Sequence, residues 1–256
     1  MPEFYTLLSQ HYDTLFPAEP EIVGFLETEL ARGGTVEEGR VIDAACGTGN
    51  YTDALSRHGL ACHGFDASRD MIEVARKQQK RGTFEVRALE EMGGLTGGEG
   101  GAPVDARWCG LFCIGNSLPH LGDRAGVADF FRNAARVLEP AGQLVVQTLN
   151  LARFDPAGEA GGEVELPPIE RNKITMRRTY RPASEEGQVL FHAELTDSRG
   201  RSVKSDTSLP ALSVDELTRY ARSAGFRDVT TFGSYARGPY DPDSSFVVVL
   251  TALRAP

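Results

Sequence analysis

Apolar residues along the chain follow two periods. Over residues 4–16 and 124–138 they recur every three or four positions, which predicts amphipathic helices. Shorter apolar runs lie between such stretches and are bounded by glycine, proline or charged residues, which predicts buried strands. The predicted helices cover residues 4–16, 19–32, 50–58, 68–80 and 124–138, and the predicted strands cover 40–45, 61–65, 83–88, 106–114 and 143–150. Strands that alternate with helices form a parallel sheet with helices on both faces.

The alternation stops after residue 150. Residues 151–209 lack a helical period and predict an antiparallel insertion. Its expected strands are 170–180, 189–196 and 203–209, with turns at 184–187 and 197–200. The α/β pattern then resumes with a helix over 214–224, N-capped by Ser213, and with strands over 228–233 and 245–253. The sequence therefore predicts an α/β domain from residues 1–150 and 210–256, with a small β insertion at 151–209.

Two glycine- or proline-containing stretches predict connections rather than regular structure. The glycine-rich residues 93–101 are expected to form a loop. Pro140, Ala141 and Gly142 are expected to turn the chain from the helix at 124–138 into the next strand.

Charge and cysteine content limit the partners and the compartment. Among 256 residues, 27 Lys and Arg stand against 36 Asp and Glu, a formal net charge of −9 that repels phosphate backbones, so no nucleic-acid partner is expected. A basic group at residues 171–181 is typical of a solvated strand face. We find no signal-peptide pattern and no apolar run of about 20 residues, so we expect a soluble, cytoplasmic protein without a membrane partner. The cysteines show no metal-ligand spacing, so no metal is expected; they are Cys46, Cys62, Cys109 and Cys113.

The candidate chemistry begins at a glycine-containing turn after the first strand of the α/β pattern. Residues 41–50 read VIDAACGTGN, in which Gly47 and Gly49 let a ligand approach the backbone closely. A dinucleotide-binding turn would read GxGxxG and place a third glycine at position 52, where Thr52 stands. The pattern therefore argues against a nicotinamide-dependent oxidoreductase.

An acidic residue ends the next predicted strand. Asp66 lies 23 positions after Asp43, a spacing at which a carboxylate can accept hydrogen bonds from both ribose hydroxyls of an adenosine group. Two structural alternatives remain open. Asp66 can cap the following helix, and Asp43 can brace the glycine turn by accepting its N–H groups.

Residues 41–76, VIDAACGTGNYTDALSRHGLACHGFDASRDMIEVAR, resemble the first two motifs of the class I S-adenosylmethionine-dependent methyltransferases. The segments GNSLPHL at 115–121 and PAGQLVV at 140–146 are similar to later parts of the same family. The resemblance implies a Rossmann-like, seven-stranded, mostly parallel sheet whose last strand is antiparallel. It also implies S-adenosylmethionine as the cofactor and methyl transfer as the reaction.

The resemblance implies a set of cofactor contacts. The loop Ala45–Gly49 would lie against the methionine part and Asp66 would bind the ribose. Ala88 stands where many members carry an acid for the adenine amino group, so either Leu89, through its backbone N–H, or Glu90 would take that role. The complete set of implied cofactor residues is Asp43, Ala45, Gly47, Gly49, Asp66, Ala67, Met71, Leu89, Glu90 and Ile114.

The segment at 115–121 and the N-terminal tyrosines are similar to those of glycine and sarcosine N-methyltransferases and related small-molecule enzymes. That likeness implies Asn116, His120 and Tyr12 as catalytic residues. It implies Tyr5, Asn150, Arg153 and Arg178 as acceptor contacts, with Arg153, Arg177 and Arg181 as rivals of Arg178 for an acceptor carboxylate. Each residue has a structural alternative, because Asn116 can cap a turn, while His120, Tyr5 and Tyr12 can pack in the core.

The expected function is methyl transfer to a nitrogen or oxygen of a small molecule by in-line displacement. Such a reaction requires alignment and exclusion of water rather than a metal or a covalent nucleophile. Methylation of a macromolecule and a non-catalytic cofactor-binding module remain as alternatives. The sequence identifies neither the methyl acceptor nor the oligomeric state.

Overall fold

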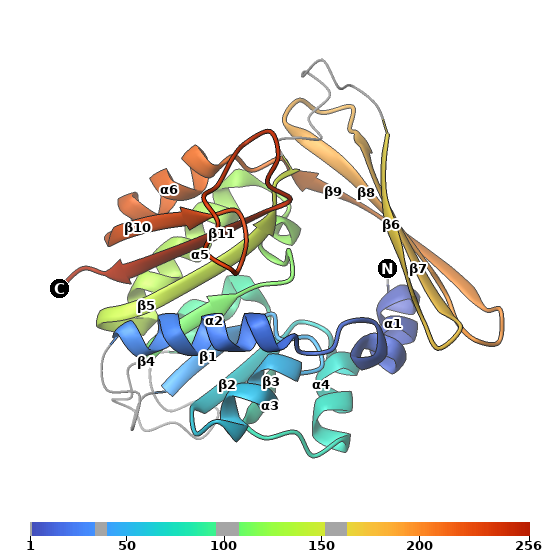
Figure 1. The fold of residues 1–256 in the computed structure, drawn as a ribbon, viewed down its shortest axis with the longest axis horizontal. Coiled ribbons are helices and arrows are strands. Elements are labelled where there is room, and N and C mark those ends of the chain that lie inside the picture. The colour runs from blue at the N-terminus through green and yellow to red at the C-terminus, as the bar shows by residue number, and fades with distance from the viewer. Residues whose placement is uncertain (1, 34–39, 96–107, 152–162) are drawn as a thin grey trace.

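A computed structural model of the chain describes residues 2–33, 40–95, 108–151 and 163–256, and its centre is a seven-stranded sheet (Figure 1). The strand order is β10-β11-β5-β4-β1-β2-β3. β11 runs antiparallel to both of its neighbours, whereas β1 to β5 pair in parallel. The strands are β1 (Arg40–Ala44), β2 (Ala61–Asp66), β3 (Thr83–Val86), β4 (Trp108–Cys113), β5 (Leu138–Leu149), β10 (Phe226–Phe232) and β11 (Val247–Arg254). This sheet confirms the predicted fold class.

Helices cover both faces of the sheet because adjacent strand residues point to opposite sides. On β1, Ile42 packs in a cluster with residues of α5 (Arg124–Val137) and α6 (Val214–Ser223). The neighbouring Val41 packs in a second cluster with residues of α2 (Pro20–Leu30) and α3 (Asn50–Arg57). Ser213 caps α6 in a capping box with Glu216, as its sequence position predicts.

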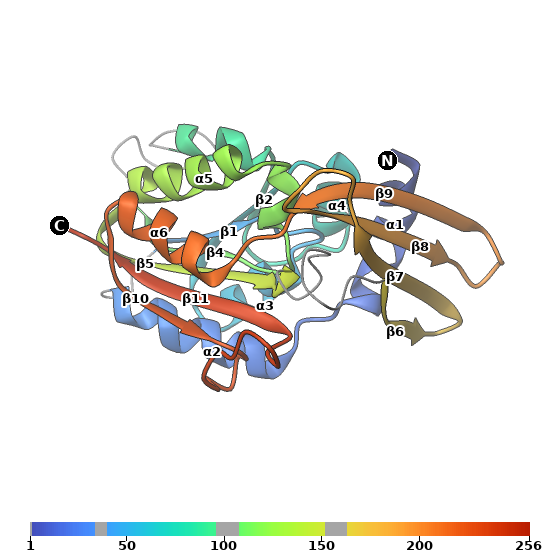
Figure 2. The ribbon, with the colours of Figure 1, turned by 90° about the horizontal axis from the view of Figure 1, so that it is seen from above.

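A second, antiparallel sheet of order β6-β7-β8-β9 stands beside the first (Figure 2). Its strands are β6 (Val164–Arg171), β7 (Ile174–Pro182), β8 (Gln188–Thr196) and β9 (Ser202–Pro210). Helix α1 (Pro2–Leu15) packs its apolar face against this sheet and against Met71 of α4 (Arg69–Lys77). Arg124 of α5 also joins the two sheets, because it donates to the carbonyls of Gly187 and Ala211.

The structure corrects three local predictions. Residues 170–180 are not one strand: β6 ends at Arg171, Asn172 and Lys173 turn the chain with positive φ, and β7 begins at Ile174. β6 itself was not predicted, because its two prolines and charged residues hide the apolar alternation. Residues 140–142 belong to β5 as an irregular stretch, across which the register against β4 shifts.

The glycine-rich stretch 93–101 is only partly a described loop. Gly93 and Gly94 close a 3-10 helix over Leu89–Gly94, and residues 96–101 lie outside the described part of the chain. Within the described ranges, no helix has the length and apolar character needed to cross a membrane. The same ranges contain no group of three or more His, Cys, Asp or Glu side chains placed to hold a metal ion.

Candidate active site

The central strands β1 and β4 are neighbours whose chains leave the sheet toward opposite faces. After β1 the chain enters α3 on one face, and after β4 it leads into α5 on the other. In open α/β sheets this topological switch point, at the carboxyl ends of the strands, is where ligands bind. The predicted site residues Ala45, Gly47 and Asn116 all follow one of these two strands.

The turn after β1 depends on left-handed backbone conformations. Ala45, Gly47 and Gly49 have φ of 60°, 57° and 78°. A Cβ on Gly49 would lie 2.2 Å from the ring of Phe84, so this position admits glycine alone without rearrangement. The N–H of Cys46 donates to the carbonyl of Phe65 at 2.9 Å, which fastens the turn to β2.

Asp66 is bonded directly to this turn. Its Oδ2 accepts a hydrogen bond from the N–H of Gly47 at 2.9 Å, and its Oδ1 accepts one from the N–H of Ser68 at 2.8 Å. Burial raises the pKa of Asp66, while these two hydrogen bonds oppose the shift. Each oxygen keeps a second lone pair. The carboxylate therefore braces the turn, and it can also accept hydrogen bonds from a diol.

Asp43 joins β1 to α3 through Thr52, rather than to the N–H groups of the turn. It is buried and accepts a hydrogen bond from Thr52 Oγ1 at 2.6 Å, and burial raises its pKa to about 7. Thr52 fits beside the strands because its neighbours are small. A Cβ on Gly64 would lie 2.7 Å from Thr52 Oγ1, and one on Gly82 would lie 2.6 Å from Thr52 Cγ2. In a dinucleotide motif a third glycine at position 52 allows close packing of the helix on the strands. Here Gly64 of β2 and Gly82 before β3 leave the room that Thr52 needs.

The N-terminal helix brings two predicted tyrosines to the turn. A Cβ on Gly47 would lie 3.0 Å from Tyr12 Cζ and 3.2 Å from its hydroxyl oxygen, so the phenol lies against Gly47. Burial, and secondarily the charge of Asp66, raises the pKa of both Tyr5 and Tyr12. Both are therefore neutral phenols at neutral pH. Met71 lies under this helix, where it packs with Phe4, Leu7 and other residues of the same cluster.

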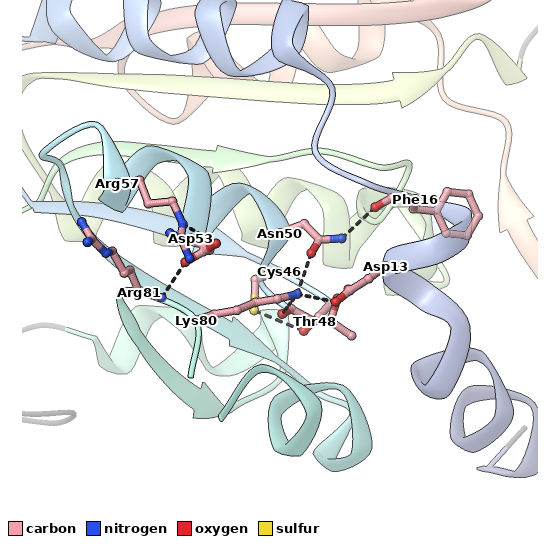
Figure 3. Close-up of polar contacts among 10 residues, drawn as sticks. Asp13, Phe16, Cys46, Thr48, Asn50, Asp53, Arg57, Lys80 and Arg81 are labelled. Carbon is pink, nitrogen blue, oxygen red and sulfur yellow. Dashed lines mark hydrogen bonds and ion pairs between the residues drawn. The ribbon is translucent and has the colours of Figure 1, made fainter. Parts of the chain in front are cut away.

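Four polar residues connect α1 to the turn, and three of them, Asp13, Asn50 and Lys80, were not predicted as site residues (Figure 3). Lys80 Nζ donates to Asp13 Oδ2 at 2.8 Å, and the Thr48 hydroxyl donates to the other oxygen of Asp13. Asn50 Nδ2 donates to the carbonyl of Phe16 at 2.8 Å. Asp13 is the neighbour of the predicted Tyr12, so the N-terminal motif could have indicated it. Lys80 follows α4 and lies outside every motif, so no sequence pattern indicated it.

The end of β4 also departs from ordinary backbone geometry. Gly115 and Asn116 have φ of 76° and 62° in succession. Asn116 Oδ1 accepts the N–H of Leu149 at 2.9 Å, and Gln147 Oε1 accepts the N–H of Gly115 at 2.8 Å. Gly115 adopts positive φ freely, whereas Asn116 is a non-glycine residue in the left-handed region, and such residues are found frequently at active sites. Ile114, just before them, is buried beneath the turn.

His120 and Asn150, both predicted at this edge, lie in different surroundings. The ring of His120 meets Phe191 of β8 edge-on at 6.2 Å, and desolvation lowers the pKa of the imidazole. Asn150 is buried, donates to the carbonyls of Pro242 and Ser245, and accepts from the Tyr240 hydroxyl at 3.2 Å. Its amide thus fastens the loop between β10 and β11.

The predicted arginines Arg178 and Arg177 differ in burial and in their partners. Arg178 lies on the face of β7 shared with Met176 and Tyr180, donates to the Pro167 carbonyl at 3.1 Å and has a buried Nε without a hydrogen-bond partner among the described residues. Burial lowers the pKa of its guanidinium. Arg177 pairs with an exposed glutamate at 3.3 Å, and Arg153 lies outside the described residues.

The predicted adenine contacts lie around the ends of β2 and β3. Ala67 is exposed just after Asp66. Leu89 is half-buried against the main hydrophobic core, whereas Glu90 is exposed. The N–H of Ala88 donates to the Glu91 carboxylate at 3.1 Å. The position of Leu89 is thus the more compatible with packing against an adenine ring.

The fold and this turn define a Rossmann-like domain. Residues 41–142 match the protein family described as "Methyltransferase domain". Rat glycine N-methyltransferase is 33% identical over 119 residues, which are 43% of this chain and 40% of that protein. The ubiquinone biosynthesis O-methyltransferase of Xylella fastidiosa strain 9a5c is 32% identical over 162 residues, 61% of this chain and 60% of the relative. The chain thus matches about half the length of these relatives.

Solved structures share the fold over nearly the whole chain. An S-adenosylmethionine-dependent methyltransferase from Clostridium acetobutylicum superimposes with a TM-score of 0.76 at 13% identity, covering 99% of this chain and 100% of the other. The CcbJ methyltransferase from Streptomyces caelestis gives 0.76 at 21% identity, covering 97% and 96%. Over residues 41–142 the chain is thus similar to S-adenosylmethionine-dependent methyltransferases, as its motifs predicted.

Proposed function

We propose that this protein transfers a methyl group from S-adenosylmethionine to a nitrogen or oxygen atom of a small molecule. The observation that carries the proposal is the hydrogen bond from Gly47 N to Asp66, because it joins the two parts of one cofactor site. The turn Ala45–Gly49 would lie along the methionine part, and Asp66 would accept from the ribose hydroxyls. Leu89 would pack on the adenine, with Ala67 beside it.

The cofactor supplies an electrophilic methyl group on a sulfonium, and the protein aligns the acceptor with it. Tyr12 covers the methionine end of the site as a neutral phenol, which helps to exclude water. Asn116 would orient the acceptor through its Nδ2 group, which has no partner among the described residues. His120 would take the acceptor's proton, because a lowered pKa keeps the imidazole neutral near pH 7.

The second sheet supports a small acceptor. Phe191 and Tyr180 stack at 5.0 Å on the face that meets His120, so the second sheet, β6 to β9, would form a wall of the acceptor site. Arg178 on the same face would pair with an acidic group of the acceptor. Two relatives are named as methyltransferases of glycine nitrogen and of an oxygen in ubiquinone biosynthesis, and both names fit a small acceptor. The four cysteines are buried free thiols, which favours a reducing compartment such as the cytoplasm.

The test is calorimetric titration with S-adenosylmethionine and, separately, with NAD. It is followed by an assay of S-adenosylhomocysteine release with amino acids, amines and phenols. We expect binding of S-adenosylmethionine alone and turnover with at least one acceptor class. Asn116→Ala should lower turnover and leave cofactor affinity unchanged. Binding without transfer to any acceptor would leave a non-catalytic module, and failure to bind would refute the assignment.

A further inference from the structure

The ammonium group of Lys80 lies at the beginning of α3, beneath the turn (Figure 3). It donates to Asp13 Oδ2 at 2.8 Å, to the Thr48 carbonyl at 3.0 Å and to Asn50 Oδ1 at 2.5 Å. A lysine has three N–H donors, so all of them are used. Only 9% of the side chain is exposed. Lys80 is therefore a buried strut and not a solvated surface lysine.

This place is electrostatically unfavourable for a cation. The N-terminus of a helix carries a partial positive charge, and desolvation adds to the cost of burying an ammonium. Within the described ranges, the one carboxylate in an ion pair with Lys80 is Asp13, which comes from α1. Docking of α1 thus supplies the ion-pair partner that offsets this cost, so the strut couples helix and turn.

Asp13 and its neighbours complete the connection. The two oxygens of Asp13 accept hydrogen bonds from Lys80 and from the Thr48 hydroxyl, so one carboxylate binds both the lysine and the turn. Asn50 in turn receives Lys80 and donates to the carbonyl of Phe16, just after α1. Tyr12 lies just before Asp13 in the chain, and its phenol lies against Gly47.

We propose that Lys80 and Asp13 are positioning residues that hold Tyr12 and α1 against the glycine turn, and thereby make α1 a wall of the cofactor site. The inference rests on the proposed function for its catalytic meaning. Lys80 acts through Tyr12 and the turn and touches no reacting atom. Without the strut, Tyr12 leaves Gly47 and the methionine end of the site opens to water.

The first test needs no cofactor. Hydrogen–deuterium exchange is compared among the wild type, Lys80→Met, which keeps an unbranched side chain one atom shorter and removes the charge, and Asp13→Asn. Lys77→Met is the matched control, because Lys77 lies nearby on α4, pairs with Glu73 and is 76% exposed. We expect residues 2–16 and 46–50 to exchange faster than in the wild type in both Lys80→Met and Asp13→Asn. In the control, Lys77→Met, the exchange rate should not change. Unchanged exchange in both would overturn the proposal.

The second test separates positioning from general support. Lys80→Met should weaken binding of S-adenosylhomocysteine by roughly tenfold, the loss associated with one charge-assisted hydrogen bond. In a double-mutant cycle of Tyr12→Phe and Lys80→Met, the fold-loss in kcat of the double variant should be smaller than the product of the two single fold-losses. The reason is that Lys80 acts through Tyr12. Fully multiplicative effects would refute the coupling. If the wild type binds no S-adenosyl compound, the proposed function fails, while the exchange result still decides the role of Lys80.

Discussion

The backbone N–H of Gly47 donates to the Asp66 carboxylate at 2.9 Å, across 19 residues of sequence. One hydrogen bond therefore links the turn after β1 with the residue that ends β2. The same carboxylate also accepts the N–H of Ser68, the N-cap of α4, so any change at Asp66 affects the local backbone as well as its own contact with a ligand.

Replacement of Asp66 by alanine should weaken binding of S-adenosylmethionine by about 1–3 kcal/mol, because a ribose contact and the brace on Gly47 are lost together. Calorimetric titration measures the loss. Glu73→Gln, on the following helix α4 and in a half-exposed ion pair, is the control and should bind as the wild type does. Equal affinity of Asp66→Ala and the control would remove Asp66 from the site.

Replacement of Gly49 by alanine should lower the free energy of unfolding by more than about 1 kcal/mol, since φ is 78° and the new Cβ would meet Phe84. Gly59→Ala is the matched control, because Gly59 has φ of 101° but no atom within 4 Å of a built Cβ. Denaturant titration should show the larger loss at Gly49. The excess should shrink when Phe84 is also changed to alanine, and an excess that persists would contradict the steric explanation.

Replacement of Arg237 by alanine should destabilise the protein by up to about 3–5 kcal/mol, because the fully buried Glu29 would keep only Arg32, at 3.5 Å, as an ion-pair partner among the described residues. The guanidinium also lies over Phe25 at 4.9 Å and Phe232 at 5.6 Å. Arg132→Ala serves as the comparison, since the Arg132–Asp129 pair is exposed and should contribute at most about 1 kcal/mol. Similar denaturation midpoints for the Arg237 and Arg132 variants would argue that the Arg237–Glu29 pair does not stabilise the loop between β10 and β11.

Asp43 should make stability depend on pH. Its pKa is raised from 3.8 to about 7 by burial, so the folded protein keeps a proton that the unfolded chain releases above pH 3.8. The free energy of unfolding contributed by Asp43 is therefore greatest below about pH 4 and falls as the pH rises to about 7. The difference in stability between the wild type and Asp43→Asn should follow this fall, as measured by denaturant titration at several pH values. A difference that is constant from pH 4 to pH 7 would contradict the assignment.

Much of the fold could be predicted because its information is local. Period and turn residues indicated the alternation through residue 150, the insertion and the cap at Ser213. β6 and the turn at Asn172 and Lys173 were missed, because pairing in an antiparallel sheet depends on neighbours along other strands and leaves a weak local pattern.

The candidate site divides in the same way. The glycines of the turn and Asp66 were predicted from residue type and spacing, because the backbone conformation at Gly49 and the position of an acid after β2 depend on nearby sequence. The bracing role of Asn150 and the difference between Arg178 and Arg177 were not, because each depends on which distant segment packs against the residue.

By itself, therefore, the sequence determined the alternating sheet, the glycine turn and the carboxylate that follows it, since these are set by short-range periodicity and by conformations that few residues adopt. Only the tertiary structure decided that Lys80 meets Asp13, from positions 67 residues apart, and that α1 lies on the turn. The physical reason is that a buried charge takes whichever partner the packing of the whole chain provides, and no local pattern specifies that partner.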